Sequence, residues 1–376
     1  MDERARRLIE WVLGPGKRGD LADFVGGVAE TLVSLGMPVH RAGALLDTLH
    51  PRFIGMQRIW EPGGDTREGR ATFDDPQIAS GLVRYTIDDV QETGQWFDLK
   101  LDDPRADGYD LLPALRARGY THYAMAPLEF VQGPIQGLSL ATRHPGGFSR
   151  ADLDLVDAAR PALAAVLELK AGARVGREIL QAYVGTVPGE MILSGRIRRG
   201  DVTNLRAALL MSDLRGFTSM SLALAPEAVV ARLNAYFDHV VPAIVSRGGE
   251  ILKFIGDGVL AIADARALGE EAACRAMLDA ALAAQEGFAA AGMRAGIALH
   301  LGDVAFGNIG AGDRLDFTAI GRDVNLLARL EKMCGTLGEA VVASAEFATA
   351  LKRPWRRLGD YTFKGFEGAR EVFAPD

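Results

Sequence analysis

The second half of the sequence alternates strand-like and helix-like segments in an order that few folds accommodate. A buried-strand run at 207–212 precedes a long helix that begins at Pro226, and two later apolar runs flank Gly256-Asp257-Gly258, which predicts a β-hairpin. The remaining predicted elements are a helix at 270–291, strands at 294–301 and 304–307 joined by a turn at 302–303, a strand at 317–320 and a helix at 323–333. This β-α-β-β-α-β order with extra strands predicts an α+β domain with a ferredoxin-like core, an open sheet and helices on one face.

The first half of the chain carries a different pattern. A length of 376 residues exceeds what one hydrophobic core usually organises, so we expect two domains. Ser149 is a favourable N-cap for a helix that reaches about Lys170. The other predicted elements of residues 1–170 are helices at 21–35 and 39–49, strands at 82–87, 122–127 and 136–142, and a loop at 102–110.

Residues 171–204 are expected to connect the two domains. Apolar side chains between Val175 and Val184 have helical spacing, and Gly185, Pro188 and Gly189 are expected to break the helix after them. The apolar stripe is compatible with a core helix and equally with a short coiled coil between two protomers. The predicted organisation is therefore a domain at 1–170, a helical connector at 171–204 and a second domain at 205–376.

Composition narrows the classes of function. The formal net charge of −7 argues against a nucleic-acid-binding protein, which normally presents a basic face. Cys274 and Cys334 are too few for a disulfide framework and are expected to be reduced and structural. The charged N-terminus has too short an apolar run for a secretory signal, and no apolar run reaches about 18 residues. We therefore expect a cytoplasmic protein that binds neither nucleic acid nor membrane.

Two aspartates stand where an acidic residue is locally costly, although a single aspartate at a strand end or a turn is commonly structural. Asp213 ends the strand-like run, and Asp257 lies at the tip of the predicted hairpin. On adjacent strands of one sheet they could converge on Mg²⁺, which is usually held by one or two carboxylates and by substrate phosphates. The loop of Gly216, Phe217 and Thr218 leads into a helix whose first N–H groups suit a triphosphate.

Four further polar residues are candidates for substrate contacts. Asn325 and Arg329 are four residues apart in a predicted helix and therefore share one face. Lys253 lies inside an apolar strand, where protection of a sheet edge is the alternative explanation. Lys364 lies in a predicted turn near the end of the chain.

Three of these segments resemble the signature blocks of class III nucleotidyl cyclases, in the order and spacing of that family. They are Ser-Asp-Leu-Arg-Gly-Phe-Thr at 212–218, Lys-Phe-Ile-Gly-Asp-Gly at 253–258 and Phe-Thr-Ala-Ile-Gly-Arg-Asp-Val-Asn-Leu-Leu-Ala-Arg-Leu at 317–330. The resemblance covers about residues 205–376. It implies that two Mg²⁺ or Mn²⁺ ions bind at Asp213, Leu214 and Asp257. It also implies that Lys253 and Thr318 read adenine, that Asn325 and Arg329 act on the ribose and the transition state, and that Lys364 meets the phosphates.

The resemblance further implies an adenylyl cyclase that makes cyclic AMP and pyrophosphate from ATP. Lysine can donate to adenine N1 and a threonine hydroxyl can accept from the 6-amino group, whereas guanine reverses both demands. Thr318 replaces the aspartate of many animal and mycobacterial relatives, which is the pattern of the subclass that includes bicarbonate-responsive cyclases. In that family the metal-binding residues and the base-reading residues of one site come from two protomers, so a homodimer is expected.

The first domain resembles GAF sensory domains. The resemblance lies in a glycine-containing strand, Gln136-Gly-Leu-Ser-Leu-Ala-Thr, and the turn Phe148-Ser149-Arg-Ala-Asp152 before a closing helix. It implies an α/β domain that binds a small-molecule ligand, of a kind the sequence does not identify. An unrelated α+β domain is the alternative for residues 1–170.

Three other functions compete with that of an adenylyl cyclase for the second domain. A guanylate cyclase and a catalytically silent nucleotide-sensing module remain open as alternatives. Diguanylate cyclases share the fold, but Arg247-Gly-Gly-Glu250 lies before the strand and not in the hairpin turn that carries their signature, so we reject that class.

Overall fold

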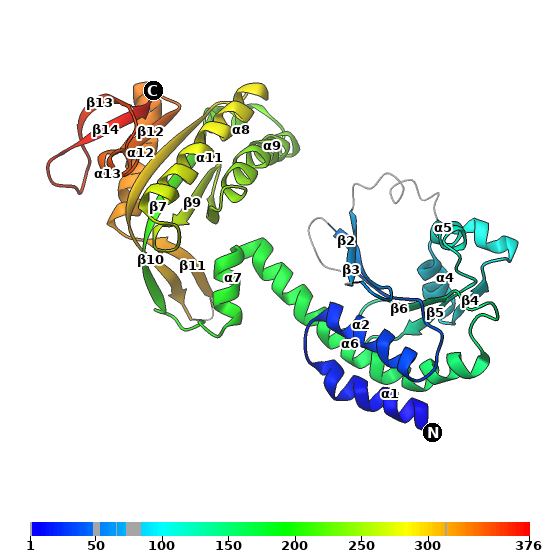
Figure 1. Ribbon diagram of the computed structural model, residues 1–376. Coiled ribbons are helices and arrows are strands. Elements are labelled where there is room, and N and C mark those ends of the chain that lie inside the picture. The colour runs from blue at the N-terminus through cyan, green and yellow to red at the C-terminus, as the bar shows by residue number, and fades with distance from the viewer. Residues whose placement is uncertain (1, 48–52, 65, 73–83, 313) are drawn as a thin grey trace. The chain divides into compact units, whose positions relative to one another are not determined.

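The computed structural model describes residues 2–47, 53–64, 66–72, 84–312 and 314–376. The chain divides into two compact units, Met1–Ile179 and Leu180–Asp376. Each unit has its own sheet and its own hydrophobic clusters (Figure 1), and each is described by itself.

The N-terminal unit is built on a six-stranded antiparallel sheet with the order β3-β2-β1-β6-β5-β4. Its strands are β1 (Arg41–Asp47), β2 (Phe53–Trp60), β3 (Arg67–Thr72), β4 (Phe97–Lys100), β5 (His122–Leu128) and β6 (Gln136–Thr142). Its helices are α1 (Glu3–Leu13), η1 (Pro15–Lys17), α2 (Leu21–Ser34), α4 (Thr86–Thr93), η2 (Pro104–Gly108), α5 (Leu111–Ala117) and most of α6 (Arg150–Val184).

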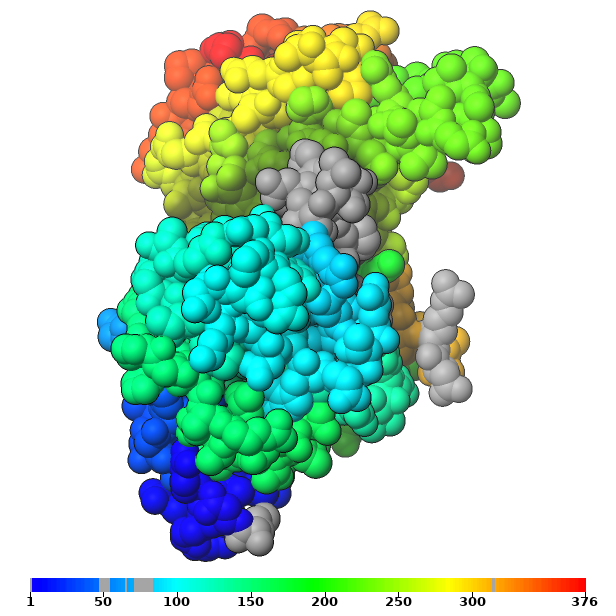
Figure 2. Space-filling model, turned by 90° about the vertical axis from the view of Figure 1, so that its right-hand side faces the viewer, coloured from blue at the N-terminus to red at the C-terminus, as the bar shows by residue number. Residues whose placement is uncertain are grey.

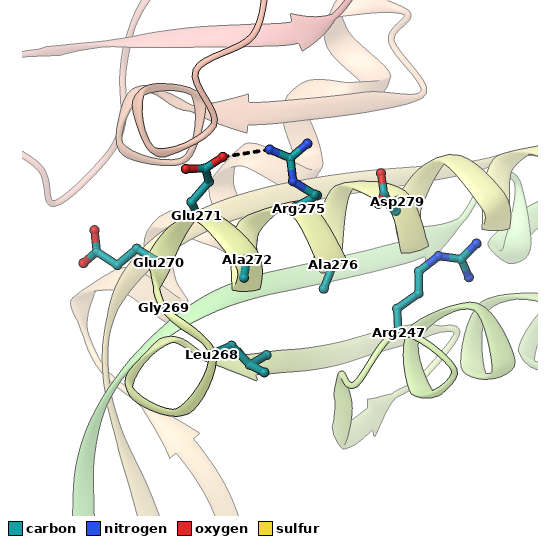
Figure 3. A pocket seen from close by; sticks show the side chains of 9 residues that line it. All are labelled: Arg247, Leu268, Gly269, Glu270, Glu271, Ala272, Arg275, Ala276 and Asp279. Carbon is teal, nitrogen blue, oxygen red and sulfur yellow. Dashed lines mark hydrogen bonds and ion pairs between the residues drawn. The ribbon is translucent and has the colours of Figure 1, made fainter.

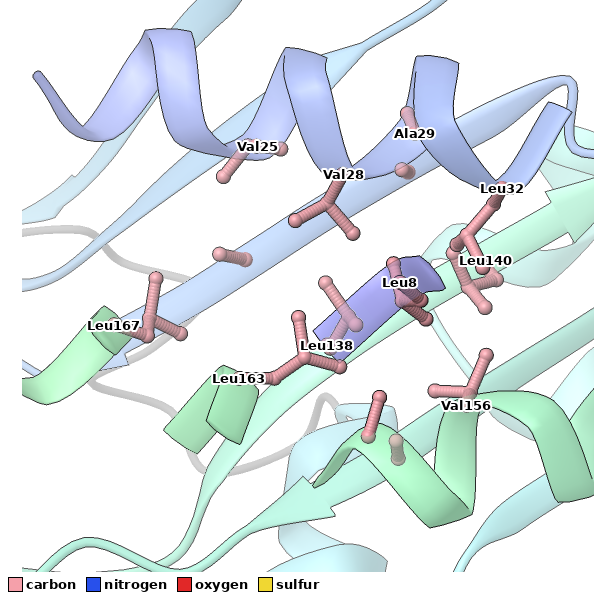
Figure 4. Close-up of a cluster of buried hydrophobic side chains, with 14 of the residues drawn as sticks. Leu8, Val25, Val28, Ala29, Leu32, Leu138, Leu140, Val156, Leu163 and Leu167 are labelled. Carbon is pink, nitrogen blue, oxygen red and sulfur yellow. The ribbon is translucent and has the colours of Figure 1, made fainter. Parts of the chain in front are cut away.

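The two faces of this sheet carry different clusters because side chains alternate along each strand. Ala42 and Ala44 of β1 point into the core under α1, α2 and α6, where Leu8, Val28, Leu138, Leu140 and Leu163 pack together (Figure 4). A second apolar cluster on the opposite face contains side chains of α4, η2 and α5. The segment that contains α4, η2 and α5 is cyan in the surface view (Figure 2). Arg41 and Gly43 therefore face the second cluster.

Three predicted elements of the N-terminal unit are wrong. The expected helix at 39–49 is strand β1 where the structure describes it, because residues 41–45 pair in register with β6. The expected strand at 82–87 lies partly outside the described residues, and its last two residues begin helix α4. The expected loop at 102–110 contains the short helix η2. The helix at 21–35 and the strands at 122–127 and 136–142 are confirmed.

Helix α6 begins as predicted. Asp152 accepts hydrogen bonds from both the N–H and the hydroxyl of Ser149, and burial of the carboxylate is offset by these bonds, so its pKa is lowered. The helix runs on to Val184, and Gly185 breaks it with a φ of +96°. Pro188 and Gly189 do not break a helix, contrary to expectation. They lie inside α7 (Thr186–Leu193), where Pro188 falls in the first turn and removes no intrahelical hydrogen bond.

The C-terminal unit contains an eight-stranded sheet with the order β13-β14-β12-β10-β7-β9-β8, and β11 pairs with β10. Its strands are β7 (Val202–Leu214), β8 (Glu250–Ile255), β9 (Gly258–Asp264), β10 (Ala295–Ala311), β11 (Arg314–Ile320), β12 (Val341–Ser344), β13 (Trp355–Thr362) and β14 (Ala369–Pro375). Its further helices are α8 (Phe217–Ala223), α9 (Pro226–Val245), α10 (Ala265–Leu268), α11 (Glu270–Ala290), α12 (Arg322–Leu337) and α13 (Ala345–Ala350). The succession β7-α9-β8-β9-α11-β10 is the predicted β-α-β-β-α-β core.

Helices cover both faces of this sheet, so the expectation of helices on one face is wrong. Helices α9, α11 and α13 share a cluster with Ala208 and Leu210 of β7, whereas α12 shares another with Ala207 and Leu209. Consecutive residues of one strand point to opposite faces, so these clusters lie on the two sides of the sheet. A strand that is apolar on both faces requires cover on both.

Strand β10 is continuous, although a turn was expected at 302–303. Gly302 and Asp303 stay paired with Ala207 and Arg206 of β7. A Cβ atom on Gly302 would collide with the side chain of Asp323. Glycine is therefore required at position 302 for a close approach of α12, and not for a turn.

Among the described residues, α9 is the one helix long and apolar enough to cross a membrane by length and composition. It packs on the sheet through Tyr236, Val240 and Ile244 and carries the charged residues Glu227 and Arg232. A helix that covers one face of a domain meets the same criteria.

Candidate active site

Asp213 and Asp257 are brought together at one end of the C-terminal sheet. Asp213 pairs with Gly258, the residue next to Asp257. A Cβ atom on Gly258 would lie 2.9 Å from the Ser212 carbonyl oxygen and 3.3 Å from Asp213 Oδ1, so glycine lets the hairpin tip approach the strand end. Burial and the neighbouring Asp257 carboxylate raise the pKa of Asp213. Two carboxylates in this position disfavour each other's ionised form unless a cation lies between them.

This pair has the donor set that hard divalent cations prefer. Among the residues that the structure describes, no group of three or more His, Cys, Asp and Glu side chains could hold a metal ion. Mg²⁺ does not need such a group, because substrate phosphates and water usually complete its octahedron. The Asp213 and Asp257 oxygens therefore fit a divalent cation that binds together with a phosphate-bearing substrate.

The segment after Asp213 is a sharp turn into a short helix. Leu214 is buried, the Arg215 N–H donates to the Arg294 carbonyl at 2.9 Å, and Gly216 has a φ of +77°. Helix α8 begins at Phe217, so the N–H groups of Phe217 and Thr218 belong to its first turn and have no partner within the helix. This arrangement can present N–H donors to an anion.

A second layer behind Asp213 was not predicted. Arg215 Nη2 lies 3.2 Å from Oε1 of Glu331, a buried residue of α12. Burial, followed by the Asp213 charge, raises the pKa of Glu331. Gly296 leaves room for this arginine, since a Cβ there would collide with the guanidinium. The sequence offers one signal for this pair. Glu331 is an acidic residue at a helical position that is otherwise flanked by the apolar Leu327 and Cys334.

Lys253 lies beside the strand that carries Thr318. The Lys253 ammonium forms an ion pair and hydrogen bond with Asp316 of β11. Thr318 is two residues further along β11 and therefore faces the same side as Asp316. The structure thus places the two predicted base-reading residues near each other. Asp316 was not among the predicted site residues.

Asn325 and Arg329 lie on the exposed side of α12. The opposite side of this helix buries Leu326 and Leu330 against the sheet. Within the described part of the chain, neither Asn325 nor Arg329 forms a side-chain hydrogen bond or ion pair. Both side chains are therefore available to a substrate or a partner.

The first turn of α12 is fixed by Asp323. Its carboxylate accepts a hydrogen bond from the Asp303 N–H at 2.7 Å. Its pKa is lowered, first by the neighbouring His300, whose Nε2 lies 3.7 Å from the carboxylate. His300 is buried, and its Nδ1 lies 2.7 Å from the Ser344 hydroxyl. This anchor holds the segment that leads to Asn325.

Lys364 lies in the exposed turn between β13 and β14. The buried Phe363 next to it joins the cluster that contains Leu326 and Leu330 of α12. Among the described residues, no hydrogen bond or ion pair links Asp213 or Asp257 with Lys253, Thr318, Asn325, Arg329 or Lys364. In the described part of the chain, the candidate residues therefore form two groups that no hydrogen bond or ion pair joins.

A hollow on the surface of the C-terminal unit contains none of these residues. It lies along the first turns of α11, beside Arg247 and Leu268 (Figure 3). Two of its charged residues, Glu271 and Arg275, are paired with each other at 2.8 Å. An open groove on one helix of this kind does not compete with the carboxylate pair as a catalytic centre.

Residues 203–373 match the family model described as the adenylate and guanylate cyclase catalytic domain. The C-terminal unit is thus similar to the catalytic domain of adenylate and guanylate cyclases. It carries the βαββαβ core and the paired aspartates described above. The match spans less than half of the chain and does not include the N-terminal unit.

Named proteins that are similar to this chain include adenylate cyclases. Adenylate cyclase 1 of Rhizobium meliloti is 31% identical over 215 residues, which is 52% of this chain and 32% of that protein. The adenylate cyclase of Anabaena cylindrica is 29% identical over 172 residues, 42% of this chain and 33% of that protein. The chain thus spans about a third of the length of these curated relatives. The crystal structure of the adenylyl cyclase CyaB from P. aeruginosa is 27% identical, covers 46% of this chain and 94% of that chain, and has a TM-score of 0.41.

Proposed function

We propose that the protein is an adenylate cyclase that converts ATP into 3′,5′-cyclic AMP and pyrophosphate. The observation that carries the proposal is the convergence of Asp213 and Asp257 in a domain of the cyclase family. The availability of Asn325 and Arg329 supports catalysis rather than a silent nucleotide sensor, because a sensor does not need a free cation for a transition state.

Two Mg²⁺ or Mn²⁺ ions per site would be held by Asp213 and Asp257, with the Leu214 carbonyl as a further oxygen donor. When bound, such ions supply neutralisation of charge at the attacking oxygen and on the leaving phosphates. The second layer of Arg215 and Glu331 keeps the end of β7 fixed against α12. The two carboxylates are therefore held in position before substrate arrives.

The chemistry is an in-line attack of the ribose 3′-OH on the α-phosphorus, with pyrophosphate as the leaving group. Asn325 would orient the ribose, and Arg329 would supply fixed positive charge where negative charge accumulates in the transition state. Lys364 and the N–H groups of Phe217 and Thr218 would bind the phosphates, with Gly216 permitting the tight turn.

The base is proposed to be adenine. Lys253 can donate to adenine N1 and Thr318 can accept from the 6-amino group. The ion pair with Asp316 holds the Lys253 ammonium beside β11, the strand that carries Thr318. Guanine presents an N1–H donor and an O6 acceptor, so it would leave this lysine facing a donor.

We propose further that the catalytic unit acts as a homodimer with sites shared between protomers. Support comes from the two groups of candidate residues, which no hydrogen bond or ion pair joins among the described residues of one chain. Large apolar side chains lie exposed on α8 and β8, namely Leu222 (85% exposed) and Phe254 (50% exposed). An exposed apolar surface of this kind marks an interaction site, and a two-fold axis would complete both sites at once.

The N-terminal unit is proposed to be a GAF-like domain that regulates this activity. Support comes from its six-stranded antiparallel sheet, which is covered by helices on both faces and closed by α6. The unit would act through α6 and α7. The latter is tied to the catalytic unit by a 2.6 Å hydrogen bond from the Val187 N–H to Glu250.

A turnover assay tests the central proposal. Purified full-length protein is incubated with ATP or GTP and with Mg²⁺ or Mn²⁺, and cyclic nucleotide and pyrophosphate are quantified. We expect metal-dependent cyclic AMP formation with a preference for ATP. A preference for GTP would select the guanylate cyclase alternative, and the absence of both products with either metal would select the silent module.

A further inference from the structure

The N-terminal unit holds a buried cation that forms no ion pair with any acidic residue that the structure describes. Arg41 of β1 is only 4% exposed. In the described part of the chain its guanidinium forms no hydrogen bond and no ion pair. Burial lowers the pKa of Arg41, which reflects the cost of this charge in its surroundings. Buried charges in proteins are almost always paired, so an unpaired guanidinium requires an explanation.

The register of the sheet places Arg41 on the same face as two polar side chains, Tyr123 and Ser139. Arg41 lies opposite Ala141 of β6, which lies opposite Tyr123 of β5, so all three share the face that carries α4 and α5. In the next row a Cβ atom on Gly43 would lie 2.8 Å from the Ser139 hydroxyl and 3.7 Å from Arg41 Nη1. The guanidinium therefore lies over Gly43, close to Ser139.

The groups around Arg41 are hydroxyls. The Tyr123 hydroxyl is 3.1 Å from the Thr86 hydroxyl of α4, and both residues are buried. The Ser139 hydroxyl donates to the Gly43 carbonyl at 3.1 Å. Hydroxyls can donate to an anion but cannot neutralise a cation.

The acid that faces Arg41 is already bound by other groups. Glu61 accepts hydrogen bonds from Arg118 at 2.6 Å and from the Tyr120 hydroxyl at 3.0 Å, and Arg67 lies 3.6 Å away. The contribution of Glu61 to Arg41 is a longer-range attraction without an ion-pair contact, and Arg118 opposes it with a like charge. Three arginines thus face one carboxylate, which leaves the region with an excess of positive charge.

We propose that Arg41 is the anchor of a binding site in the N-terminal unit for a small molecule that carries a carboxylate or a phosphate. The planar fork of arginine matches both groups with two parallel N–H donors. The Tyr123, Thr86 and Ser139 hydroxyls lie on the same face of the sheet and supply further donors. The apolar side chains of the same face, such as Met125, suit a ligand whose anionic group is attached to an apolar body.

The proposal goes beyond cyclase activity, and its test does not depend on turnover. Thermal unfolding of the full-length protein is followed after dialysis into buffered sodium chloride. The probes are sodium phosphate, sodium acetate and sodium benzoate, each titrated at constant ionic strength. The variant is Arg41→Met, which keeps the length of the side chain and removes the charge. The matched control is Arg116→Met, since Arg116 is an exposed arginine of the same unit that is paired with Asp107.

We expect at least one probe to raise the melting temperature of wild type and of Arg116→Met by about 2–4 °C at saturation, and to leave Arg41→Met unchanged. Phosphate alone as the active probe would identify a phosphate ligand, and acetate or benzoate a carboxylate ligand. No shift of the wild type with any probe, or an equal shift in Arg41→Met, would overturn the proposal.

The same samples separate a binding role from a structural one. Without any probe, Arg41→Met should melt at the same temperature as wild type or above it, because a buried unpaired charge is removed. A structural arginine behaves in the opposite way, so a melting temperature clearly below that of Arg116→Met would also count against the site.

Discussion

Two carboxylates that lie side by side at the end of β7 are held there by backbone pairing and not by attraction. Replacing Asp213 with asparagine keeps the shape and removes one charge. We expect the rate of cyclic AMP formation to fall at least about a hundredfold, which is about 3 kcal/mol of lost transition-state stabilisation. The melting temperature should not fall, because burial and then repulsion by Asp257 disfavour the ionised form of Asp213 and raise its pKa in the wild type. Steady-state kinetics and thermal unfolding measure the two effects.

The control for this variant is Asp279→Asn, an exposed aspartate of α11. It should retain the wild-type rate. An Asp213→Asn enzyme with a near-wild-type rate at the same metal concentration would show that Asp213 does not hold the metal.

Lys253 and Thr318 give the second residue-scale prediction. Exchanging both, as Lys253→Glu with Thr318→Cys, should lower kcat/KM for ATP and raise kcat/KM for GTP, because the new pair accepts from guanine N1–H and donates to O6. Lys352→Glu makes the same charge change at an exposed lysine and should keep the ATP preference. Unchanged base selectivity in the double variant would contradict the assignment.

For single residues, the sequence identifies the chemical type of a site residue better than it identifies the residues that contact it. The acidic character and strand-end positions of Asp213 and Asp257 were visible, because turn glycines and apolar runs are local signals. The ion pair of Lys253 with Asp316 joins residues 63 positions apart, and the contact of Arg215 with Glu331 joins residues 116 positions apart. Such partners depend on how β8 and α12 lie against the rest of the sheet, which no local pattern encodes.

Among the elements, the errors have a common physical cause. The stretch at 39–49 has apolar residues at spacings that suit a helix, yet β6 offers it a row of backbone partners and it becomes a strand. Gly302-Asp303 has the composition of a turn, yet both residues pair with β7. Tertiary pairing overrides local preference in both cases. Long periodic helices such as α9 and α11 were predicted correctly because their amphipathic faces carry their own signal.

Helix α7 supports an element-scale prediction about the connector. Met191 of α7 is buried in the cluster that contains Leu252 and Leu260 of the catalytic unit. A fragment of residues 180–376 retains α7, whereas a fragment of residues 195–376 lacks it. The shorter fragment should be less stable by about 2 kcal/mol, the value of one buried methionine side chain. Urea unfolding of both fragments measures this difference.

The same fragments test regulation. If the N-terminal unit acts through the connector, the 180–376 fragment should turn over ATP at a rate that differs from that of the full chain at equal protein concentration. Identical rates over a range of protein concentrations, with equal stability of the two fragments, would indicate that neither the connector nor the N-terminal unit matters to the catalytic unit.

For the whole molecule, the separation of the two residue groups leads to a complementation experiment. Asp213→Ala and Asn325→Ala homodimers should each be inactive or nearly so. After mixing and full exchange, about half of the dimers contain one chain of each kind, and each of these has one intact site. About a quarter of the wild-type activity should therefore return, measured as cyclic AMP formed per total protein.

A second mixture serves as the control for that experiment. Asp213→Ala mixed with Asp257→Ala should stay inactive, because both defects fall in the same group of residues. If the Asp213→Ala and Asn325→Ala mixture stays equally inactive after exchange has been verified by mass spectrometry, the site does not combine residues from two chains.

Strand β7 gives the catalytic unit a mechanical constraint. It starts at Val202, beside the connector residues whose backbone is hydrogen-bonded to Asn308, and it ends at the Asp213 carboxylate. Its 13 residues span about 40 Å; β10 pairs with the whole strand, and β9 pairs with residues 207–213. A slip by one residue would turn every side chain to the wrong face, so we do not expect the strand to slide along its axis. If the proposed regulation acts at Val202, we therefore expect the strand to tilt as a rigid body, which would move Asp213 at its other end.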